Sequence, residues 1–317
     1  MPRPTSSTTI ARPELKALAM EYLEDQADFV GIQALPIFDV QQQSGTYPVI
    51  PLEALLNVPS TRRAPRAPYP RDDFEFETDT YDCVENGYEE PVDDVERRLY
   101  RRFFDAEEVA MMRALGIILR GQEKRIADML FNSSNFTANS VTTEWDTAAT
   151  CTPISDVKAG RKAIHDACGM EPDTLIISYT TFLDLGLADQ IVDRIKYTNP
   201  NVSRGDIAPS LLAQAFGVQR ILVGKGMYNS AAKGQAASLA EIWDKEYAML
   251  AVTNATPDLK KPCVGRTFRW VADAPQNTMV ESYREEAIRS DVIRVRQHTD
   301  EEIVLTAAAY LMDNIHT

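Results

Sequence analysis

The sequence has no run of about 18 apolar residues, the length that a membrane-spanning helix needs. Its first residues, MPRPTSSTTIARPELK, contain no apolar core of the kind that a signal peptide carries. These two absences exclude helical membrane proteins and secreted precursors. They predict a soluble chain that is made in the cytosol and has no membrane partner.

Cysteine and histidine are both scarce, with four cysteines and three histidines. The cysteines show no CxxC spacing, and in a reducing compartment we expect free, buried thiols at Cys83, Cys151, Cys168 and Cys263. His165 and Cys168 could supply two metal ligands from one helix, but no nearby cluster supplies a third and a fourth, so no metal site is predicted. His298 falls in a predicted turn and His316 in the tail, and neither is placed as a general base.

Catalytic motifs are absent as well. The chain has no GxSxG elbow, no GxxxxGK[ST] loop and no GxGxxG before a helix. The glycines of LVGKGMYNSAAKGQ (222–235) follow a predicted strand, as in phosphate-binding loops, but their spacing indicates an ordinary turn. We therefore expect no enzyme, no catalytic residue and no cofactor. A nucleotide-binding enzyme that uses the 222–235 loop is kept as a hypothesis from a different class.

Positive charge is in short supply. The 317 residues include 47 Asp and Glu but only 33 Lys and Arg, a net charge of −14. Such a chain is a poor general binder of nucleic acid or anionic membranes, because both are anionic. It suits a protein that lies near nucleic acid without adhering to it. The exception is a basic cluster in a proline-rich stretch: Arg62, Arg63, Arg66 and Arg71.

The first 80 residues predict extended structure around that basic cluster. A polar tail (1–12) and a short amphipathic helix (13–24) precede an apolar arm, FVGIQALPIFDV. Two short strands around a Ser44-Gly45 turn follow, and beyond the prolines a strand in which Phe74 and Phe76 alternate with glutamates. This pattern predicts a long two-stranded hairpin with a basic tip. Because an isolated hairpin is marginally stable in water, we expect it to lie on a partner; a disordered linker is the alternative.

A long helix is predicted over 105–131, with Asp105 as its N-cap and Glu107 and Glu108 in its first turn. We expect it to be a scaffold helix that packs on the core. The residues expected to make its apolar contacts are Val109, Met112, Ile117, Leu119, Ile126 and Leu130.

Alternating helices and strands predict a compact α/β subdomain over about 154–280. Thr152 is the expected cap of a helix that begins at Pro153 and stops at Gly169. Its expected buried stripe is Ile154, Val157, Ile164 and Cys168. A strand (175–178), a helix (182–195), and a second helix and strand over 207–223 follow. Residues 287–315 predict a closing hairpin that turns at 298–302.

Several stretches, taken in their order, resemble a known family. They are YDCVENGYEEPVDD (81–94), WDTAATCTPISD (145–156), EPDTLIIS (171–178), RILVGKGMYNSAAKG (220–234) and LAEIWDKEYAMLAV (239–252). In this order they resemble the major capsid protein of tailed bacteriophages, which has the HK97-like fold. The resemblance spans essentially the whole chain.

The resemblance implies an α+β protein with the parts of the HK97-like capsid fold. These are an N-terminal arm (1–35), an extended β-hairpin loop (36–80), a peripheral domain (81–153) with its spine helix (105–131), an α/β axial domain (154–280) and a return to the peripheral domain (281–317). Since no long cleavable segment precedes the arm, scaffolding is expected to be a separate protein or already removed.

The resemblance also implies a function. The chain would self-assemble into pentamers and hexamers of an icosahedral shell enclosing double-stranded DNA, in a virion assembled in the host cytoplasm. Expected partners are copies of itself, separate scaffolding, portal and decoration proteins, and DNA contacted non-specifically. The alternative is an encapsulin-like nanocompartment shell that encloses a cargo protein. The residues expected at contacts between subunits are Arg62, Arg63, Arg66, Arg71, Phe29, Ile37 and Phe38.

Overall fold

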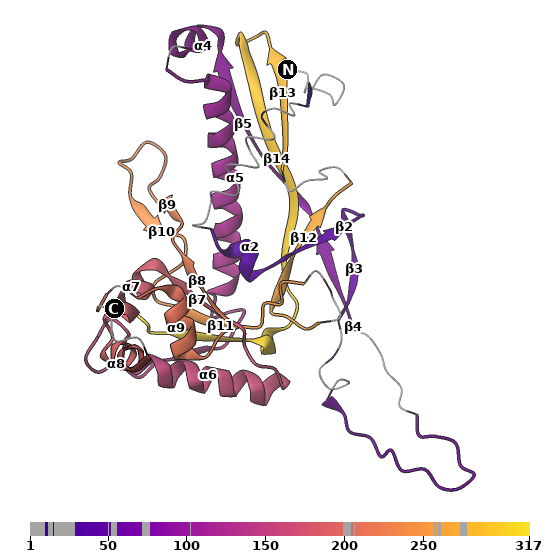
Figure 1. Cartoon of the computed structure of the whole chain (residues 1–317). Helices are drawn as coiled ribbons and strands as arrows, with labels where there is room; N and C mark the ends of the chain where they lie inside the picture. Colours follow the sequence, from indigo (N-terminus) through magenta and orange to yellow (C-terminus); the bar gives the residue numbers. More distant parts are fainter. Residues whose placement is uncertain are drawn as a thin grey trace.

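The computed structural model describes most of the chain, and Figure 1 shows its architecture. The described residues are 10–11, 15, 29–49, 51, 56–71, 77–101, 103–198, 204–205, 207–256, 258, 261–272 and 278–317. The predicted helix at 13–24, apart from Leu15, and the predicted strand residues Phe74 and Phe76 lie outside them.

One of the two main sheets formed by the described residues has six strands. Its central strand is β14 (Ser290–Ile303), which pairs with one strand along one edge and with two along the other. The order is β1-β13-β14-β12-β2, in which β13 and β12 share one edge of β14, and β5 pairs along the opposite edge. The other strands are β1 (Ile10–Ala11), β2 (Ile37–Val40), β5 (Val84–Asp93), β12 (Gly265–Trp270) and β13 (Met279–Glu285).

A long helix, α5 (Ala106–Leu130), lies along this sheet (Figure 1). Its N-cap is Asp105, as predicted, whose carboxylate accepts a hydrogen bond of 3.0 Å from the Glu107 N–H. The expected apolar face was partly wrong, because Val109 is exposed and Met112 and Ile117 are only half-buried. Apolar residues surround the first turns of the helix, so periodicity did not single out the face that meets β5 and β14. The side chains of α5 buried there are Ala110, Met111, Ala114, Leu115, Ile118 and Leu119.

The second main sheet has five strands among the described residues, in the order β6-β15-β11-β7-β8. The strands are β6 (Ala138–Ser140), β7 (Thr174–Ser178), β8 (Arg220–Gly224), β11 (Ala248–Ala251) and β15 (Ala309–Asp313). The helices that flank it are α6 (Pro153–Cys168), α7 (Tyr179–Leu187), α8 (Asp189–Thr198) and α9 (Pro209–Phe216). A hairpin of β9 (Met227–Asn229) and β10 (Leu239–Glu241) projects from this body (Figure 1).

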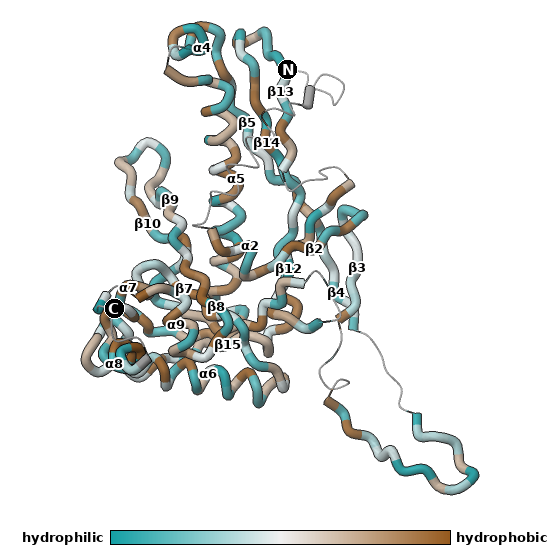
Figure 2. Tube along the Cα trace, viewed as in Figure 1, coloured by the Kyte–Doolittle hydropathy of each residue, from teal (hydrophilic) through white to brown (hydrophobic). Residues whose placement is uncertain are grey.

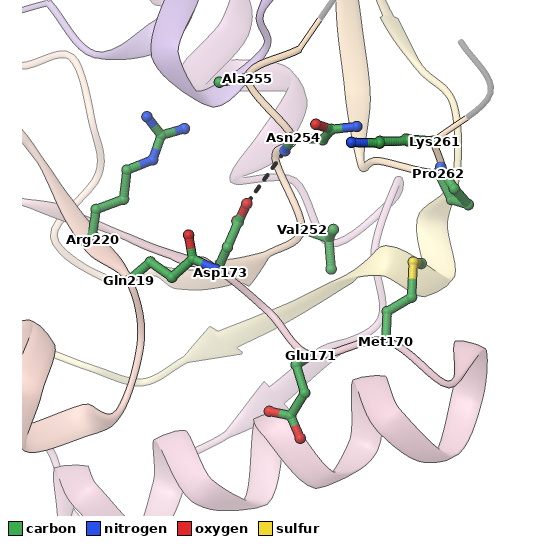
Figure 3. A pocket seen from close by; sticks show the side chains of 10 residues that line it. All are labelled: Met170, Glu171, Asp173, Gln219, Arg220, Val252, Asn254, Ala255, Lys261 and Pro262. Atoms are coloured by element: carbon green, nitrogen blue, oxygen red, sulfur yellow. Dashed lines mark hydrogen bonds between the residues drawn. The ribbon is translucent and has the colours of Figure 1, made fainter. Parts of the chain in front are cut away.

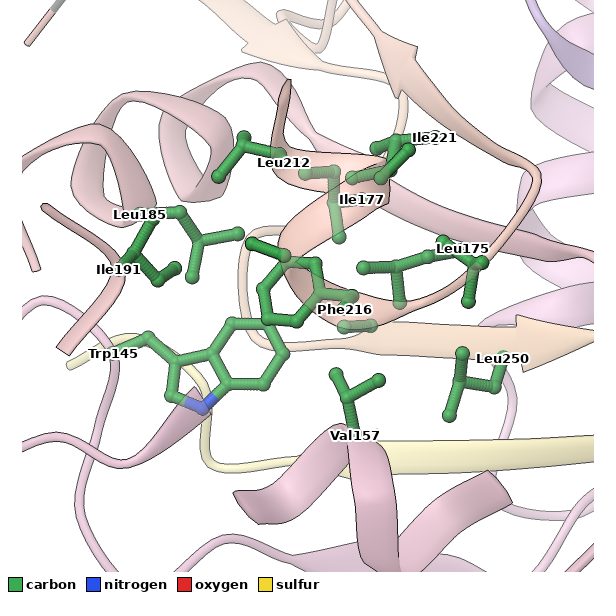
Figure 4. Close-up of a cluster of buried hydrophobic side chains, with 14 of the residues drawn as sticks. Trp145, Val157, Leu175, Ile177, Leu185, Ile191, Leu212, Phe216, Ile221 and Leu250 are labelled. Carbon is green, nitrogen blue, oxygen red and sulfur yellow. The ribbon is translucent and has the colours of Figure 1, made fainter. Parts of the chain in front are cut away.

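The core of this α/β body is built from the segments that the sequence marked as strongly patterned. Trp145 is fully buried beside Val157 of α6 and Phe216 of α9 (Figure 4). Its indole N–H donates a 3.0 Å hydrogen bond to Asp156. Hydrophobic residues, drawn in brown in Figure 2, are also concentrated along β7 and β8. The predicted strand at 175–178 and the helix–glycine–strand unit at 207–223 are confirmed.

The predicted C-terminal hairpin is wrong. Residues 298–302, expected to turn, lie inside the fourteen-residue strand β14, paired with β12 over 299–303. The polar run HTDEE (298–302) resembles a turn when it is considered alone. In the fold, Arg125 of α5 binds Thr299 and Glu301, and Trp270 of β12 contacts His298. The hairpin is instead formed by β13 and β14, and β15 leaves this sheet to pair with β11 and β6.

Two helix predictions also need correction. The helix expected over 182–195 is two helices, because Ala188 adopts an extended conformation between α7 and α8. Thr152 stands at the N-cap of α6, but its side chain makes no capping hydrogen bond. The Gln190 side chain on α8 accepts the hydrogen bond of the Ile154 N–H at 2.9 Å instead. Tertiary contacts therefore satisfy a group that the local sequence was expected to satisfy.

Candidate assembly surfaces

The extended hairpin forms, although its strand boundaries differ from the prediction. β3 (Ser44–Val49) pairs with β4 (Glu77–Asp82) in a two-stranded ribbon, and residues 57–71 between them project away from the body (Figure 1). Ser44 and Gly45 lie in β3, so the predicted turn there is wrong, and the chain turns at residues 41–43. The strand before that turn, β2, pairs with β12 rather than with β3. The ribbon is thus a separate element attached to the larger sheet.

Aromatic side chains hold the base of the ribbon against the body. Tyr47 of β3 and Tyr81 of β4 contact the ring of Phe268 on β12, with ring centroids 4.8 and 5.0 Å apart. Phe38 meets the same ring edge-on at 5.9 Å. Phe268 is fully buried, and burial raises the pKa of the neighbouring Cys83 thiol to about 12.

Carboxylates crowd the same base. Asp79 on β4 and Asp300 on β14 both lie near Glu302 of β14, and the Tyr47 hydroxyl donates a 3.3 Å hydrogen bond to Asp79. Burial, followed by the charges of Asp300 and Asp79, raises the pKa of Glu302 to about 7. Glu301 differs, since Arg125 binds it through two nitrogens at 2.9 and 3.0 Å. The ribbon base therefore carries negative charge whose amount changes near neutral pH.

The tip of the extended hairpin is basic and open to solvent. The side chains of Arg62, Arg63, Arg66 and Arg71 are all exposed. Arg63 donates to the Ala67 carbonyl at 2.7 Å and lies over the ring of Tyr69, 4.6 Å from its centroid. Arg62, Arg66 and Arg71 make no ion pair with another described residue. Their contact with a neighbouring subunit stays a prediction.

The apolar arm residues lie against their own chain. Phe29 is half-buried and packs against two hydrophobic clusters, one around Leu115 and one around Ile126 of α5. It also lies close to Gly226. Ile37 pairs with Thr267 in the parallel β2–β12 ladder, and Phe38 packs on Phe268. All three keep part of their surface exposed. Their proposed part in contacts between subunits is not tested by these contacts.

A buried carboxylate that the sequence analysis missed fastens the arm to α5. Glu123 is 2% exposed and accepts hydrogen bonds from the Val30 N–H (2.9 Å), the Gly31 N–H (2.7 Å) and the Trp243 indole (2.6 Å). Burial raises the pKa of Glu123, and the three donors oppose that shift. Gly31 begins the short helix α2 (Gly31–Ala34), and a Cβ there would lie 2.6 Å from the carboxylate. A glutamate within an apolar helix face was the signal that could have revealed this contact.

The residues considered for chemistry do not come together. His165 is exposed on α6 while Cys168 is buried, and no group of three or more potential metal ligands occurs in the described residues. All four cysteines are buried and none is disulfide-bonded. Gly224 ends β8 against Trp243, where a Cβ would lie 2.1 Å from the indole, so this glycine serves packing. Gly234 has open space around it and a positive φ of 89°, as a glycine in a turn does. None of the described helices is long and apolar enough to cross a membrane.

An open cavity of about 540 Å³ lies where the segments that lead into β7 and β8 meet the loop after β11 (Figure 3). Two of its charged side chains, Asp173 and Arg220, are engaged within the chain. Asp173 accepts hydrogen bonds from the backbone of Thr253 and Asn254, and Arg220 donates to Thr174, Thr253 and the Gln33 carbonyl. These groups brace the loop after β11 against the start of β7 and β8.

Comparison with known proteins agrees with this reading of the architecture. The chain is 27% identical over 302 residues to a protein named major capsid protein from Burkholderia phage BcepMu. The aligned region covers 91% of this chain and 93% of that protein. No protein-family model matches the chain.

Solved structures give the same result. A phage-related protein from Bordetella bronchiseptica RB50 superposes with a TM-score of 0.73 at 22% identity, over 97% of this chain and 98% of the other. A virus-like particle from Pyrococcus furiosus has a TM-score of 0.59 at 12% identity, over 95% and 98%. The capsid of phage XM1 has a TM-score of 0.53 at 8% identity, over 90% and 91%.

The chain has the HK97-like fold of phage capsid proteins, in the α+β class. Its resemblance to the major capsid proteins of tailed bacteriophages is confirmed.

Proposed function

We propose that the chain is a phage major capsid protein whose copies form the pentamers and hexamers of an icosahedral shell around double-stranded DNA. The observation that carries this proposal is the ribbon of β3 and β4 with its exposed basic tip, on a body with the capsid fold. A ribbon of two strands gains little stability alone, so its length is explained if a neighbouring subunit covers it. The proposed role is structural and involves no catalysis.

Charge supports a contact between copies. The subunit carries −14 overall, while the tip of the hairpin offers Arg62, Arg63, Arg66 and Arg71. A basic tip is attracted to the acidic body of the next copy, and this attraction fixes register as well as speeding encounter. Phe29, Ile37 and Phe38 are proposed to add apolar contact where their exposed edges meet that copy.

The proposed division of the chain follows the capsid fold. Residues 1–35 form the arm, 36–80 the extended loop, 81–153 the peripheral domain with its spine helix, 154–280 the axial domain and 281–317 the return. The rigid core around Val157 and Phe216 supports a wedge-shaped axial domain that gathers around the five-fold and six-fold axes. A fixed wedge suits ring packing because closely packed interiors do not deform continuously.

The open face of the large sheet suits proximity to DNA without adhesion. Arg294 and Arg296 alternate along β14 with residues that pack on α5, so they point to the opposite face. Each is neutralised there, Arg294 by Glu89 at 2.6 Å and Arg296 by Glu281 at 3.0 Å. Paired arginines release few counterions from DNA, so we propose non-specific and weak contact with it.

The remaining partners follow from the same proposal. Separate scaffolding, portal and decoration proteins would meet this shell, and the subunit would reside in the virion after assembly in the host cytoplasm. The alternative is an encapsulin-like shell around a cargo protein. The contents of purified shells distinguish the two, since DNA favours the phage capsid and a folded enzyme favours the nanocompartment.

Electron microscopy with light scattering on the purified protein tests the proposal. We expect closed shells or rings of five and six, and a monomer under all conditions would overturn it. Deletion of residues 55–72 is expected to abolish shell formation while leaving the subunit folded. The matched control is deletion of residues 231–237 at the tip of the β9–β10 hairpin, which is expected to assemble normally.

A further inference from the structure

The cavity of about 540 Å³ has two hydrogen-bond donors that converge on one wall. Asn254 and Lys261 line it from the loop between β11 and β12, and their side-chain nitrogens point toward one another in Figure 3. The amide nitrogen of Asn254 is buried and has no hydrogen-bond acceptor among the described residues. Because a buried donor without an acceptor costs free energy, this wall favours a ligand that brings acceptors.

The backbone fixes the direction of the Asn254 side chain. Asn254 adopts the left-handed conformation, with a φ of 37°, which asparagine tolerates better than most residues. Its N–H donates to the Asp173 carboxylate at 3.3 Å, and its carbonyl accepts a 3.0 Å hydrogen bond from Arg266. Its side-chain oxygen accepts a 3.3 Å hydrogen bond from the Thr256 N–H, so the amide loses this bond if it turns over. The amino group is therefore held in the cavity wall before any ligand arrives.

The loop that carries these donors also has cations without a carboxylate partner. Lys261 is exposed and forms no ion pair with another described residue. Arg266 of β12 is fully buried and donates to the carbonyls of Asn254, Thr256 and Asp258 at 2.9 to 3.3 Å. It too forms no ion pair within the described part of the chain. The two positive charges favour an anion at this wall.

The carboxylates of the cavity have partners within the chain. Asp173 accepts hydrogen bonds from the Thr253 N–H and hydroxyl, and from the Asn254 N–H. Glu171 pairs with Arg161 of α6 at 2.8 Å, and in Figure 3 its side chain lies toward that helix. Neither carboxylate is bonded to the two converging side-chain nitrogens. An anion that enters there therefore meets donors that no acidic side chain of the cavity occupies.

We propose that this wall binds a phosphate group, held between the ammonium of Lys261 and the amino group of Asn254. Phosphate oxygens are strong acceptors, and charge-assisted hydrogen bonds to them are stronger than neutral ones. Lys261 has a flexible four-carbon stem and is exposed, so it can swing aside and admit an oxygen between the two nitrogens. The bound group would join the two ends of the loop 254–261.

The ligand is a small phosphate-bearing anion, either inorganic phosphate or a nucleoside monophosphate. The cavity is within the size range of small-molecule sites, and Met170 and Val252 in its lining offer apolar contact beside the phosphate. This inference goes beyond the proposed shell function and does not depend on it.

Calorimetric titration of the full-length protein with inorganic phosphate, at constant ionic strength, tests the site. We expect wild type to bind and Lys261→Gln to bind about tenfold more weakly or worse, because a charged hydrogen bond is lost. Lys158→Gln, at an exposed position on α6, removes the same charge elsewhere and is expected to bind as wild type does. No binding by wild type, or equal affinity in Lys261→Gln, would overturn the proposal.

Asn254→Asp tests the second donor. Aspartate keeps the size of the side chain and tolerates the left-handed backbone, but it puts a carboxylate where the phosphate would accept a hydrogen bond. We expect phosphate to raise the unfolding temperature of wild type relative to chloride, and to leave that of Asn254→Asp unchanged. An equal rise in both proteins would contradict the site. If Asn254→Asp does not fold, Lys261→Gln still decides, since substitution of an exposed lysine changes stability little.

Adenosine monophosphate, titrated in place of inorganic phosphate, distinguishes the two sources of the group. Tighter binding than phosphate, weakened in Lys261→Gln, assigns the site to a nucleotide whose base contacts the apolar lining. Equal or weaker binding that is also weakened in Lys261→Gln assigns it to free phosphate. Nucleotide binding that is the same in wild type and Lys261→Gln would contradict the proposal.

Discussion

Glu123 shows how one residue can join distant parts of this chain. It lies on α5, yet its carboxylate accepts hydrogen bonds from the backbone of Val30 and Gly31 and from the indole of Trp243. Both carboxylate oxygens face N–H donors, so an amide in the same place would turn its own donors toward one of them. Nothing in the local sequence predicts this, because the three partners are 92 to 120 residues away.

Glu123→Gln is therefore expected to lower the free energy of unfolding by about 2–3 kcal/mol, the cost of a lost charged hydrogen bond and an unsatisfied donor. Urea unfolding of the unassembled subunit, followed by circular dichroism, measures the change. Glu108→Gln, half-exposed near the start of the same helix, is the control and should change stability little. A loss below about 0.5 kcal/mol in Glu123→Gln would contradict the role assigned to this carboxylate.

The ribbon of β3 and β4 is the element whose stability should depend on pH. The folded pKa of Glu302 is about 7, above its ordinary value of 4.5, because burial and the charges of Asp300 and Asp79 disfavour its ionised form. Between these two values the folded state holds a proton that the unfolded state has released. Stability contributed by this group is thus fully present below pH 4.5 and is lost as the pH rises through 7.

We expect the ribbon base to be more resistant to unfolding and to limited proteolysis at pH 5.5 than at pH 8. Glu302→Gln keeps the neutral form at all pH values, so the variant should exceed wild type at pH 8 and vary less between the two conditions. Glu96→Gln, exposed on the helix α4 (Asp94–Tyr100), serves as the control. An identical pH dependence in wild type and Glu302→Gln would show that other groups are responsible.

At the scale of the whole molecule, charge is divided unevenly between an acidic body and a basic tip. Attraction between exposed charges is screened over about 10 Å at 0.1 M salt and about 3 Å at 1 M. Assembly that depends on the tip should therefore be sensitive to ionic strength. The tip arginines differ in this respect from Arg294 and Arg296, which are already paired within the subunit.

A variant with Arg62, Arg63, Arg66 and Arg71 all changed to Gln should assemble at least about tenfold more slowly at low salt. The difference from wild type should shrink toward zero near 1 M salt, as light scattering would measure. Lys158→Gln with Lys162→Gln, two exposed positions on α6, is the control. Equal assembly rates for the fourfold variant and wild type at low salt would show that the tip arginines do not contribute to assembly.

Local signals in the amino-acid sequence were sufficient to predict several parts of this protein. Asp105 and the apolar residues behind it specify α5, Gly169 and Gly217 end helices in the left-handed conformation, and the prolines around the tip arginines rule out a packed element there. The ordered set of motifs from 81 to 252 was enough to indicate the capsid fold. The basic tip was predicted too, since charge and proline content need no tertiary information.

The pairing of distant segments, by contrast, depends on the folded structure. Residues 298–302 continue β14 because β12 lies alongside, β15 joins the other sheet because β11 and β6 accept it, and Glu123 is buried because Trp243 and the arm cover it. The converging donors of Asn254 and Lys261 likewise emerged only once their neighbours were placed. Strand pairing and burial depend on contacts between residues far apart in sequence, and no local pattern of hydrophobicity encodes which distant partner is present.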